Sequence, residues 1–438
     1  MTAHTVETSD DLQAGTDTNR LYRKIAWRLI PFLMVCYVAA YLDRVNVGFA
    51  KLQMLNDLQF SETVYGLGAG IFFFGYFIFE VPSNLVLQRV GARIWIARIM
   101  ITWGLISACF AFVSTPVQFY VLRFLLGAAE AGFYPGVILY LTYWIPSHRR
   151  SHMIALFMTA IPIAGIVGGP LSGWIMQHFN GHHDLAGWKW LFLLEAAPSI
   201  VLGILTPFYL SDGPAKANWL SHAEKKTVAD ALDVQARSPE KILSTTGEVF
   251  RNPRMLLMCV IYFCVIMGQY GLTFWMPTLI KAAGISDVLQ IGLFSAIPYV
   301  VAVVVMIGAG RSSDRTRERR WHLIVPMLAG AAGYAIVAAA GDNVTLALIG
   351  LSLAAAGVIT PGPLFWALPS AFLAGSAAAA GIAAINAFAG LAGFVSPYLI
   401  GYLRDMTGTS LVAMYTSAAV LVFGALLILR VPARIVNR

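Results

Sequence analysis

The main pattern along this chain is a series of long apolar runs separated by short polar segments. Each run is about 20 residues long, which is the length a helix needs to cross the hydrocarbon core of a bilayer. The runs do not alternate polar and apolar residues, so they favour helices over barrel strands. The predicted spans are 25–47, 65–86, 94–113, 117–142, 152–178, 190–210, 255–282, 287–310, 321–340, 344–368, 377–403 and 409–431.

These spans form two sets of six on either side of a polar segment. We therefore expect an all-α membrane protein with twelve transmembrane helices in two six-helix halves. Charge on a helical period over 221–238 predicts a further helix, lying along the membrane face. The predicted divisions are a cytoplasmic tail 1–24, an N-terminal bundle 25–210, a central cytoplasmic loop 211–254, a C-terminal bundle 255–431 and a cytoplasmic tail 432–438.

Basic residues predict the orientation of the spans. All but six of the 30 Lys and Arg residues lie on the side that a cytoplasmic N-terminus would place inside, in inward segments or at the inward ends of spans. By the positive-inside rule, both termini and the central loop lie in the cytoplasm, as in a multi-pass protein of a bacterial inner membrane. Of the six exceptions, Arg44 and Arg123 lie within spans. The four expected in outward loops are Lys51, Lys189, Lys281 and Arg404.

Composition agrees with a membrane protein and argues against other classes. The chain is 58% hydrophobic and only 12% charged, with a mean hydropathy of +0.71. Its net charge of +8 suits loops that face anionic lipid, so we predict contact with membrane lipid and not with nucleic acid. The four cysteines lie in apolar runs and indicate neither a disulfide framework nor a metal site. No nucleotide loop, HExxH pair or nucleophile elbow is present, so no enzyme is predicted.

Four charged residues of the first half lie far enough inside the predicted spans to be interpreted as intramembrane. Asp43, Arg44, Arg123 and Glu130 each cost about 2.5–3.5 kcal/mol at the centre of a membrane helix. Arg123 and Glu130 are two turns apart and share one face of their helix. Tyr41 and Arg44 belong to another such stripe, and the adjacent Asp43 must point about 100° away from Arg44.

Two interpretations of these charges remain open. They could form salt bridges that join the first and fourth spans, or they could line a cavity with two guanidinium groups for an anion and two carboxyl groups for protons. We favour the cavity, because an arginine fork recognises a carboxylate with two parallel hydrogen bonds. An anion that binds the arginine would weaken its hold on a neighbouring carboxylate, which would then take up a proton.

The second half has no acid or base in the middle of a span. It offers aromatic and hydrogen-bonding side chains beside Gly and Pro, which are tolerated at membrane depth where neighbouring helices or cavity water satisfy the backbone. We therefore assign charge recognition to the first half, and shape and hydrogen bonding to the second. Glu195, near the outer end of the sixth span, is interpreted as a helix-packing acid. The second-half candidates for substrate binding are Tyr270, Trp275, Trp366, Ser370 and Asn386.

Two long segments, "RFLLGAAEAGFYPGVILYLTYWIP" (123–146) and "FEVPSNLVLQRVGARIW" (79–95), carry a resemblance to a known family. The chain resembles the major facilitator superfamily and, within it, the anion:cation symporters, which carry organic anions such as sugar acids, tartrate and aromatic acids with protons. The resemblance covers about residues 20–430 and implies the major facilitator fold. It implies proton coupling by Asp43 and Glu130, and substrate binding by Arg44 and Arg123. It also implies that Tyr76 and Asn386 line the substrate cavity.

The loop after the second span of each half carries a gating motif of this superfamily. Arg89 and Arg93 in the first half align with Arg315 and Arg319 in the second. The first copy has Gln88 where the motif has Asp, whereas the second copy keeps Asp314. We therefore expect any latch built on Arg89, Arg93, Asp314 and Arg315 to differ between the halves.

The resulting functional prediction is a secondary active transporter. We expect import of a small organic carboxylate by proton symport through alternating access, in a monomer that needs no cofactor or metal besides the coupling proton. The alternative is a proton-coupled drug or ion antiporter of the same superfamily. "GGPLSGW" (168–174) is similar to an antiporter motif, except that Trp174 replaces its last Gly. A membrane sensor is a weaker third reading, because no soluble domain is long enough to signal.

Overall fold

The structure is a computed structural model that describes residues 9–237, 253–370 and 375–437. Within these ranges all regular structure is helical, and twelve helical segments are long and apolar enough to cross a membrane. Each overlaps one of the spans predicted from the sequence, so the predicted all-α fold with twelve spans is confirmed. The helix α10 (His222–Arg237) lies within the range that charge periodicity assigned to a surface helix.

The first half contains six spans, three of which are interrupted. One span breaks at Asn46, between α1 and α2, and one at Thr159, between α7 and α8. The third breaks at Gly132, whose φ of 88° suits a residue without a side chain. A Cβ at Gly132 would also meet the Ser83 side chain. The helices are α1 (Ser9–Val45), α2 (Val47–Leu58), α3 (Glu62–Val90), α4 (Ala92–Cys109), α5 (Pro116–Glu130), α6 (Phe133–Thr142), α7 (Ser147–Met158), α8 (Ala160–His178) and α9 (Gly187–Tyr209).

The second half repeats the six-span plan. One of its spans is divided into α15, α16 and α17, and a Pro begins the middle piece. The helices are α12 (Pro253–Ala282), α13 (Val288–Thr316), α14 (Trp321–Ala339), α15 (Val344–Ile359), α16 (Pro361–Phe365), α17 (Ala367–Ser370), α18 (Gly375–Thr407), α19 (Leu411–Leu429) and the short α20 (Ala433–Val436).

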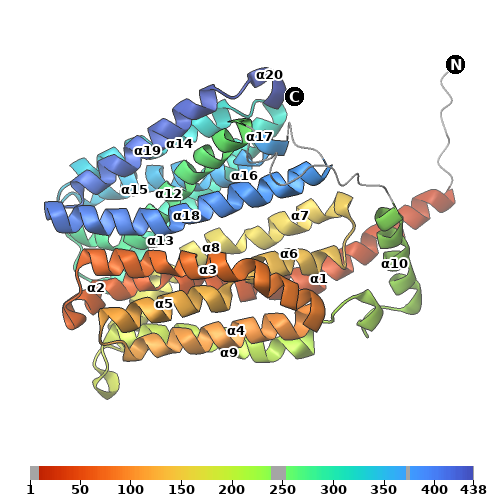
Figure 1. Cartoon of the computed structure of the whole chain (residues 1–438), viewed down its shortest axis with the longest axis horizontal. Coiled ribbons are helices and arrows are strands. Elements are labelled where there is room, and N and C mark those ends of the chain that lie inside the picture. Colours follow the sequence, from red (N-terminus) through yellow and green to blue (C-terminus); the bar gives the residue numbers. More distant parts are fainter. Residues whose placement is uncertain (1–8, 238–252, 371–374, 438) are drawn as a thin grey trace.

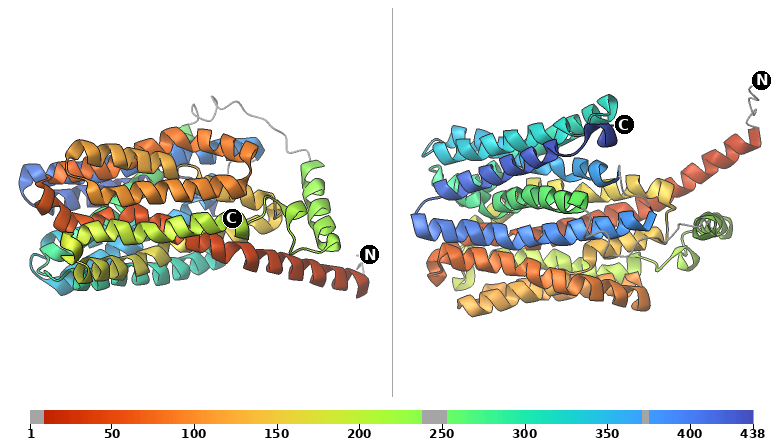
Figure 2. Two further views of the ribbon diagram at one scale, coloured as in Figure 1. Left: turned by 90° about the horizontal axis from the view of Figure 1, so that it is seen from below. Right: turned by 45° about the horizontal axis from the view of Figure 1, so that its top comes forward.

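The two halves lie side by side, with α1–α9 forming one bundle and α12–α19 the other (Figure 1). The beginning of α1 projects beyond the bundle, and α10 lies near it at the same end, to which the C-terminus also returns (Figure 2). We call this the α10 end and the opposite one, where α2 finishes, the α2 end. Because α1 begins at Ser9, helix extends back into the segment predicted as a polar tail.

The halves meet along two helix pairs, α3 with α18 and α8 with α13. A Cβ on Gly66 would collide with the backbone of Pro397, and one on Gly169 with the backbone of Gly292. Glycine is needed at these positions because the two backbones approach so closely. These contacts lie toward the α2 end. Toward the α10 end, Asn386 on α18 is exposed.

Candidate functional site

The centre of the first half contains a buried ion pair between two spans. Arg44, near the end of α1, binds the Glu130 carboxylate at the end of α5, and both side chains are almost completely buried. Aromatic rings surround the guanidinium: the Phe72 and Tyr76 ring centroids lie 5.3 and 5.5 Å from it. A charge removed from water requires such a partner, since an unpaired ion costs several kcal/mol at this depth.

Arg123 lies on the same helix as Glu130 but binds different groups. Thr115 caps the start of α5 and Pro116 occupies its first turn, which fixes where the helix begins. Arg123 is fully buried and donates to the carbonyl oxygens of Gly68 and Ala69 at 3.1 and 3.2 Å. Its Nη1 has no hydrogen-bond partner within the described residues. One arginine is therefore neutralised by an acid, and the second keeps a free donor.

Asp43 points away from Arg44, as the helical spacing predicts. Its carboxylate accepts hydrogen bonds from Ser107 at 2.7 Å, Ser199 at 2.5 Å and the Trp103 indole at 3.2 Å. These donors come from α4 and α9, and all three are neutral. Sequence reasoning did not identify them, because no pattern within one helix reveals which neighbour faces it.

The predicted tyrosines gather around Arg44. The Tyr41 ring lies 5.8 Å from the guanidinium, and Tyr270 of the second half is within electrostatic range of Arg44 and Glu130. Tyr41 also lines a cavity of about 10 Å³ between the halves, together with Thr273 and Tyr299. That volume is smaller than an organic acid needs.

The other second-half candidates are dispersed. Trp366 lies edge-on to Tyr262, at a ring-centroid distance of 5.1 Å, in the divided span. Asn386 is exposed on α18. Ser370 ends α17, but its side chain lies outside the described residues. Trp275 is fully buried at the α2 end, apart from Arg44.

Trp275 belongs to a cluster that closes the α2 end and that we call the seal, formed by Lys51, Glu62, Trp275, Arg404 and Asp405. Glu62 pairs with Lys51 at 2.6 Å and with Arg404 of the other half at 3.2 Å. The Lys51 ammonium lies 3.4 Å from the Trp275 ring centroid, a cation–π contact. The Asp405 carboxylate accepts a hydrogen bond from the Glu62 backbone N–H at 3.1 Å, so an acid of the second half caps α3.

The seal corrects the sequence-based position of Lys51. The prediction placed Lys51 in an outward loop, whereas the structure places it inside α2 with only 4% of its surface exposed. The signal for this was the apolar sequence "VGFAKLQML" around it, which continues the helical pattern past Asn46.

The gating-motif residues lie at the α10 end. In the first half, the Arg93 backbone N–H donates to Asp212, which caps α4. Arg89 and Arg315 are exposed. In the second half, Asp314 pairs with Arg319 at 2.7 Å, within its own loop. The two copies of the motif therefore make different contacts.

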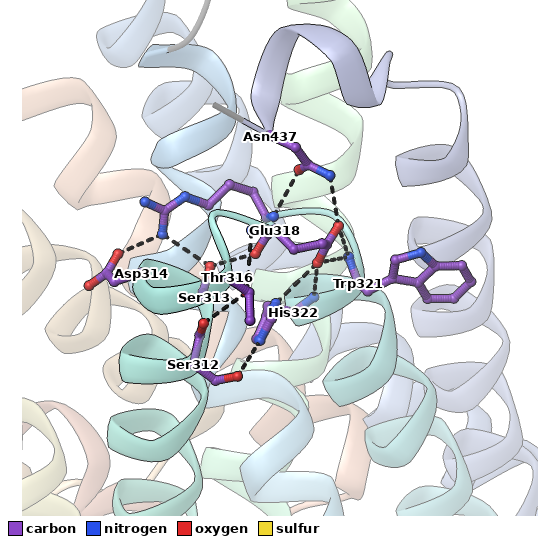
Figure 3. Close-up of polar contacts among 9 residues, drawn as sticks. Ser312, Ser313, Asp314, Thr316, Glu318, Trp321, His322 and Asn437 are labelled. Carbon is purple, nitrogen blue, oxygen red and sulfur yellow. Dashed lines mark hydrogen bonds and ion pairs between the residues drawn. The ribbon is translucent and has the colours of Figure 1, made fainter.

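Figure 3 shows Glu318 at the centre of the second-half loop, next to the chain end at Asn437. Its carboxylate accepts from the Trp321 backbone N–H at 2.8 Å, from the His322 ring at 3.0 Å and from the Asn437 amide at 3.1 Å. Burial opposes ionisation of Glu318, but these hydrogen bonds outweigh it and hold the pKa of the carboxyl below its ordinary value.

No cluster of metal-binding side chains occurs among the described residues. The structure places two buried arginines close together. Arg44 is paired with the Glu130 carboxylate, and Arg123 keeps one donor without a partner among the described residues. A dissolved carboxylate could replace the Glu130 oxygens on Arg44 while Arg123 Nη1 supplies a further hydrogen bond.

The chain matches known transporters along most of its length. The sequence profile of the Major Facilitator Superfamily matches residues 33–397. The chain is 51% identical, over 100% of its length and 99% of the relative's, to a *Pseudomonas putida* protein named as metabolite transport protein NicT. It is 46% identical to an *Agrobacterium vitis* protein named as a tartrate transporter, over 96% of this chain and 92% of that one.

Two further likenesses extend the comparison. The chain is 39% identical, over 92% of this chain and 93% of that one, to an Acinetobacter baumannii protein named as a quinolone resistance transporter. Among solved structures, it is similar to a bacterial homologue of the human lysosomal transporter Spinster in an inward-facing, occupied conformation. The TM-score is 0.76 at 15% identity, covering 94% of this chain and 97% of that one.

Proposed function

Because this chain belongs to the major facilitator superfamily and is a multi-pass secondary transporter, we propose that it imports an organic carboxylate by proton symport. The transporter works by alternating access in a bacterial inner membrane. It acts as a monomer and needs no cofactor beyond the proton. The ion pair between Arg44 and Glu130 carries this proposal, since it links anion binding to a group that can accept a proton.

The coupling follows from competition for one guanidinium. A substrate carboxylate that takes the Arg44 fork leaves Glu130 buried without its cation. A buried carboxylate without a partner is costly, so Glu130 takes up a proton. Substrate and proton therefore enter together. Asp43, held by neutral donors on the other side of α1, is a second candidate for a coupled proton.

The orientation is part of the proposal. The α10 end carries most of the Lys and Arg residues and faces the cytoplasm by the positive-inside rule. The seal then closes the outer side. In a cysteine-free background, single cysteines at Asp184 and Asp342 react from outside intact cells, whereas one at Asp230 on α10 does not. Equal labelling at Asp230 contradicts this arrangement.

Uptake in proteoliposomes with an imposed pH gradient tests the function. Acidifying the outside should drive accumulation of the acid, and each pH unit of gradient adds about 1.4 kcal/mol. The first probes are tartrate and aromatic acids, screened by thermal shift. A ligand at about 100 times its Kd stabilises the protein by about 2.7 kcal/mol.

A drug exporter is the second candidate, favoured by the likeness to the quinolone resistance transporter. An antiporter moves its substrate against the proton, so external acid would drive substrate out of the liposomes or leave uptake unchanged. The same vesicles loaded with a quinolone distinguish the two functions. Accumulation of an organic acid together with indifference to the quinolone supports symport.

A further inference from the structure

Glu195 is a second buried acid in the first half, and the coupling described above does not use it. It lies on α9 with 3% of its surface exposed. Its Oε1 accepts a hydrogen bond from the Ser172 hydroxyl of α8 at 2.8 Å. Its Oε2 has no hydrogen-bond partner in the described part of the chain. Sequence reasoning took it for a helix-packing acid, but a packing acid normally has its oxygens satisfied.

Ser172 connects Glu195 to the space between the halves. Ser172 lines a cavity of about 20 Å³ whose other walls include Phe49 of the first half and Ser295 and Tyr299 of the second. A cavity of this size has room for a water molecule. It lies toward the α2 end, where Gly169 of α8 meets Gly292 of α13. When the halves separate at that end, the cavity opens to the same side as the seal.

Glu195 is also connected to Asp43. Ser199, which donates to Asp43 at 2.5 Å, is four residues after Glu195, so both lie on one face of α9 about 6 Å apart. Asp43 lies within electrostatic range of the Glu195 carboxyl. The Asn46 amide lies next to that carboxyl. Within the described residues, neither the amide nitrogen nor the amide oxygen of Asn46 has a hydrogen-bond partner.

Among the residues that the structure describes, the groups that face Glu195 supply no positive charge. α1 contributes Asp43, α8 contributes Ser172, and α4 contributes Trp103 and Ser107 around Asp43. On α2, Asp57 bonds the Trp188 indole, about two turns farther toward the α2 end. Glu130, in contrast, has Arg44. Burial among neutral donors and beside another acid favours the neutral, protonated form of a carboxyl group over the charged form.

We propose that Glu195 is a relay residue that passes protons between the Ser172 cavity and Asp43. In the transfer the O–H bond of Glu195 breaks and an O–H bond forms on the Asp43 carboxylate. Glu195 is left as the anion and regains a proton from the cavity side. This path runs behind α1 and does not pass through the Arg44 anion site. The inference rests on the proposed proton coupling and adds a residue to it.

The first test needs no substrate. Infrared spectra of the purified full-length protein report the C=O stretch of protonated carboxyl groups, and exchange into D₂O shifts it. Glu195→Gln should remove one such component at neutral pH, while the matched substitution Thr206→Val on the same helix leaves the spectrum unchanged. If Glu195→Gln leaves the protonated-carboxyl signal intact from acid to alkaline pH, Glu195 does not carry a proton and the proposal is wrong.

The second test measures transport with tartrate as the probe. Glu195→Gln should lower uptake driven by a pH gradient about tenfold or more, while counterflow without a gradient stays within about twofold of wild type. Glu195→Asp should restore much of the driven uptake, because it keeps a carboxyl group. Ser172→Ala should slow it several-fold. Thr206→Val, whose hydroxyl bonds only the Leu202 carbonyl and Met100, is the control.

The outcomes separate this inference from the proposed function. If wild type accumulates tartrate under the gradient and Glu195→Gln does so equally well, the relay is refuted and symport stands. An equal fall in driven uptake and counterflow shows a structural role for Glu195 and also refutes the relay. If wild type accumulates no organic acid, proton symport fails, and the infrared result still decides whether Glu195 exchanges a proton.

Discussion

The two halves share one plan of six helices but differ in what they bury. Within the described residues, every buried charged side chain belongs to the first half. The second half buries hydroxyls that bond backbone: Ser396 donates to the Met267 carbonyl and Tyr334 to the Gly268 carbonyl, both at 2.6 Å. The buried charged residues are Asp43, Arg44, Lys51, Arg123, Glu130 and Glu195.

This difference indicates a division of roles. Each charge in the first half costs about 2.5–3.5 kcal/mol at membrane depth. Charged residues occur at such positions where they pair with another group or bind a ligand or a proton. The hydroxyl groups of the second half donate hydrogen bonds to backbone carbonyl oxygens of α12 near Gly268, where the helix carries glycines. Such hydroxyl groups have a partner within the protein and need no ligand. We therefore expect anion and proton chemistry in the first half, and a movable, shape-selecting wall in the second.

The largest expected effect comes from the two arginines of the first half. Arg44→Lys and Arg123→Lys keep the charge but lose the planar fork that holds a carboxylate. Losing a hydrogen-bonded charge partner in a buried site costs several kcal/mol, or about a hundredfold or more in affinity. Isothermal titration with the acid identified by thermal shift measures this. Arg98→Lys is the matched control. The Arg98 guanidinium lies 3.8 Å from the ring centroid of Trp95 on the same helix, α4.

Binding within about threefold of wild type in both Lys variants would make the pair structural. The charges of the first half would then serve only to join α1 and α5, and the comparison between the halves would lose its functional meaning.

The next effect concerns Glu130. An anion that enters a negative-inside cell works against about 2.3 kcal/mol per 100 mV, which a co-transported proton removes. Glu130→Gln imitates the protonated acid, so it should bind and exchange substrate at near wild-type rates. It should lose accumulation driven by a pH gradient. Counterflow and gradient-driven uptake in the same proteoliposomes separate the two activities, and retained accumulation would move the coupling to another acid.

Much of the fold could be predicted from the sequence, because the length of an apolar run depends on local composition. Within one helix the predictions also held: Asp43 and Arg44 face different partners. Contacts between helices could be predicted only in outline. A salt bridge between the first and fourth spans was one of the two open interpretations, and the structure forms one between Arg44 and Glu130, whereas Arg123 binds backbone carbonyl oxygens. Trp275 was assigned to the substrate, but the structure places it in the seal under Lys51. Both facts depend on how α1, α2, α5 and α12 pack.

A smaller effect is expected for the second half of the site. The Tyr270 hydroxyl lies within range of Arg44 and Glu130, and its ring packs 4.3 Å from Phe73. Tyr270→Phe keeps the ring but removes the hydroxyl group and the hydrogen bond that it can make at the Arg44 site. The affinity for the substrate acid should therefore fall by about two- to tenfold. Tyr402→Phe, on the exposed face of α18, should change nothing. A loss as large as that of Arg44→Lys would show that the second half shares in charge recognition.

The smallest effect lies at the α10 end, where the halves cap equivalent helices differently. Asp212, far along the chain, caps α4, whereas Glu318 caps α14 from the preceding loop. The folded protein holds the pKa of Glu318 below its ordinary value, through hydrogen bonds that outweigh burial. The stabilisation by the Glu318 charge is therefore complete above the unfolded pKa of about 4.3 and disappears as the pH falls through the lower folded pKa.

Glu318→Gln should lower the free energy of unfolding by about 1 kcal/mol at neutral pH, which lowers the thermal midpoint by about 1–2 °C. As the pH falls from neutral to below the folded pKa of Glu318, the variant and wild type should come to unfold at the same temperature. An unchanged difference across that range would mean that the Glu318 charge contributes nothing, and that the second-half loop depends on its packing against Asn437 alone.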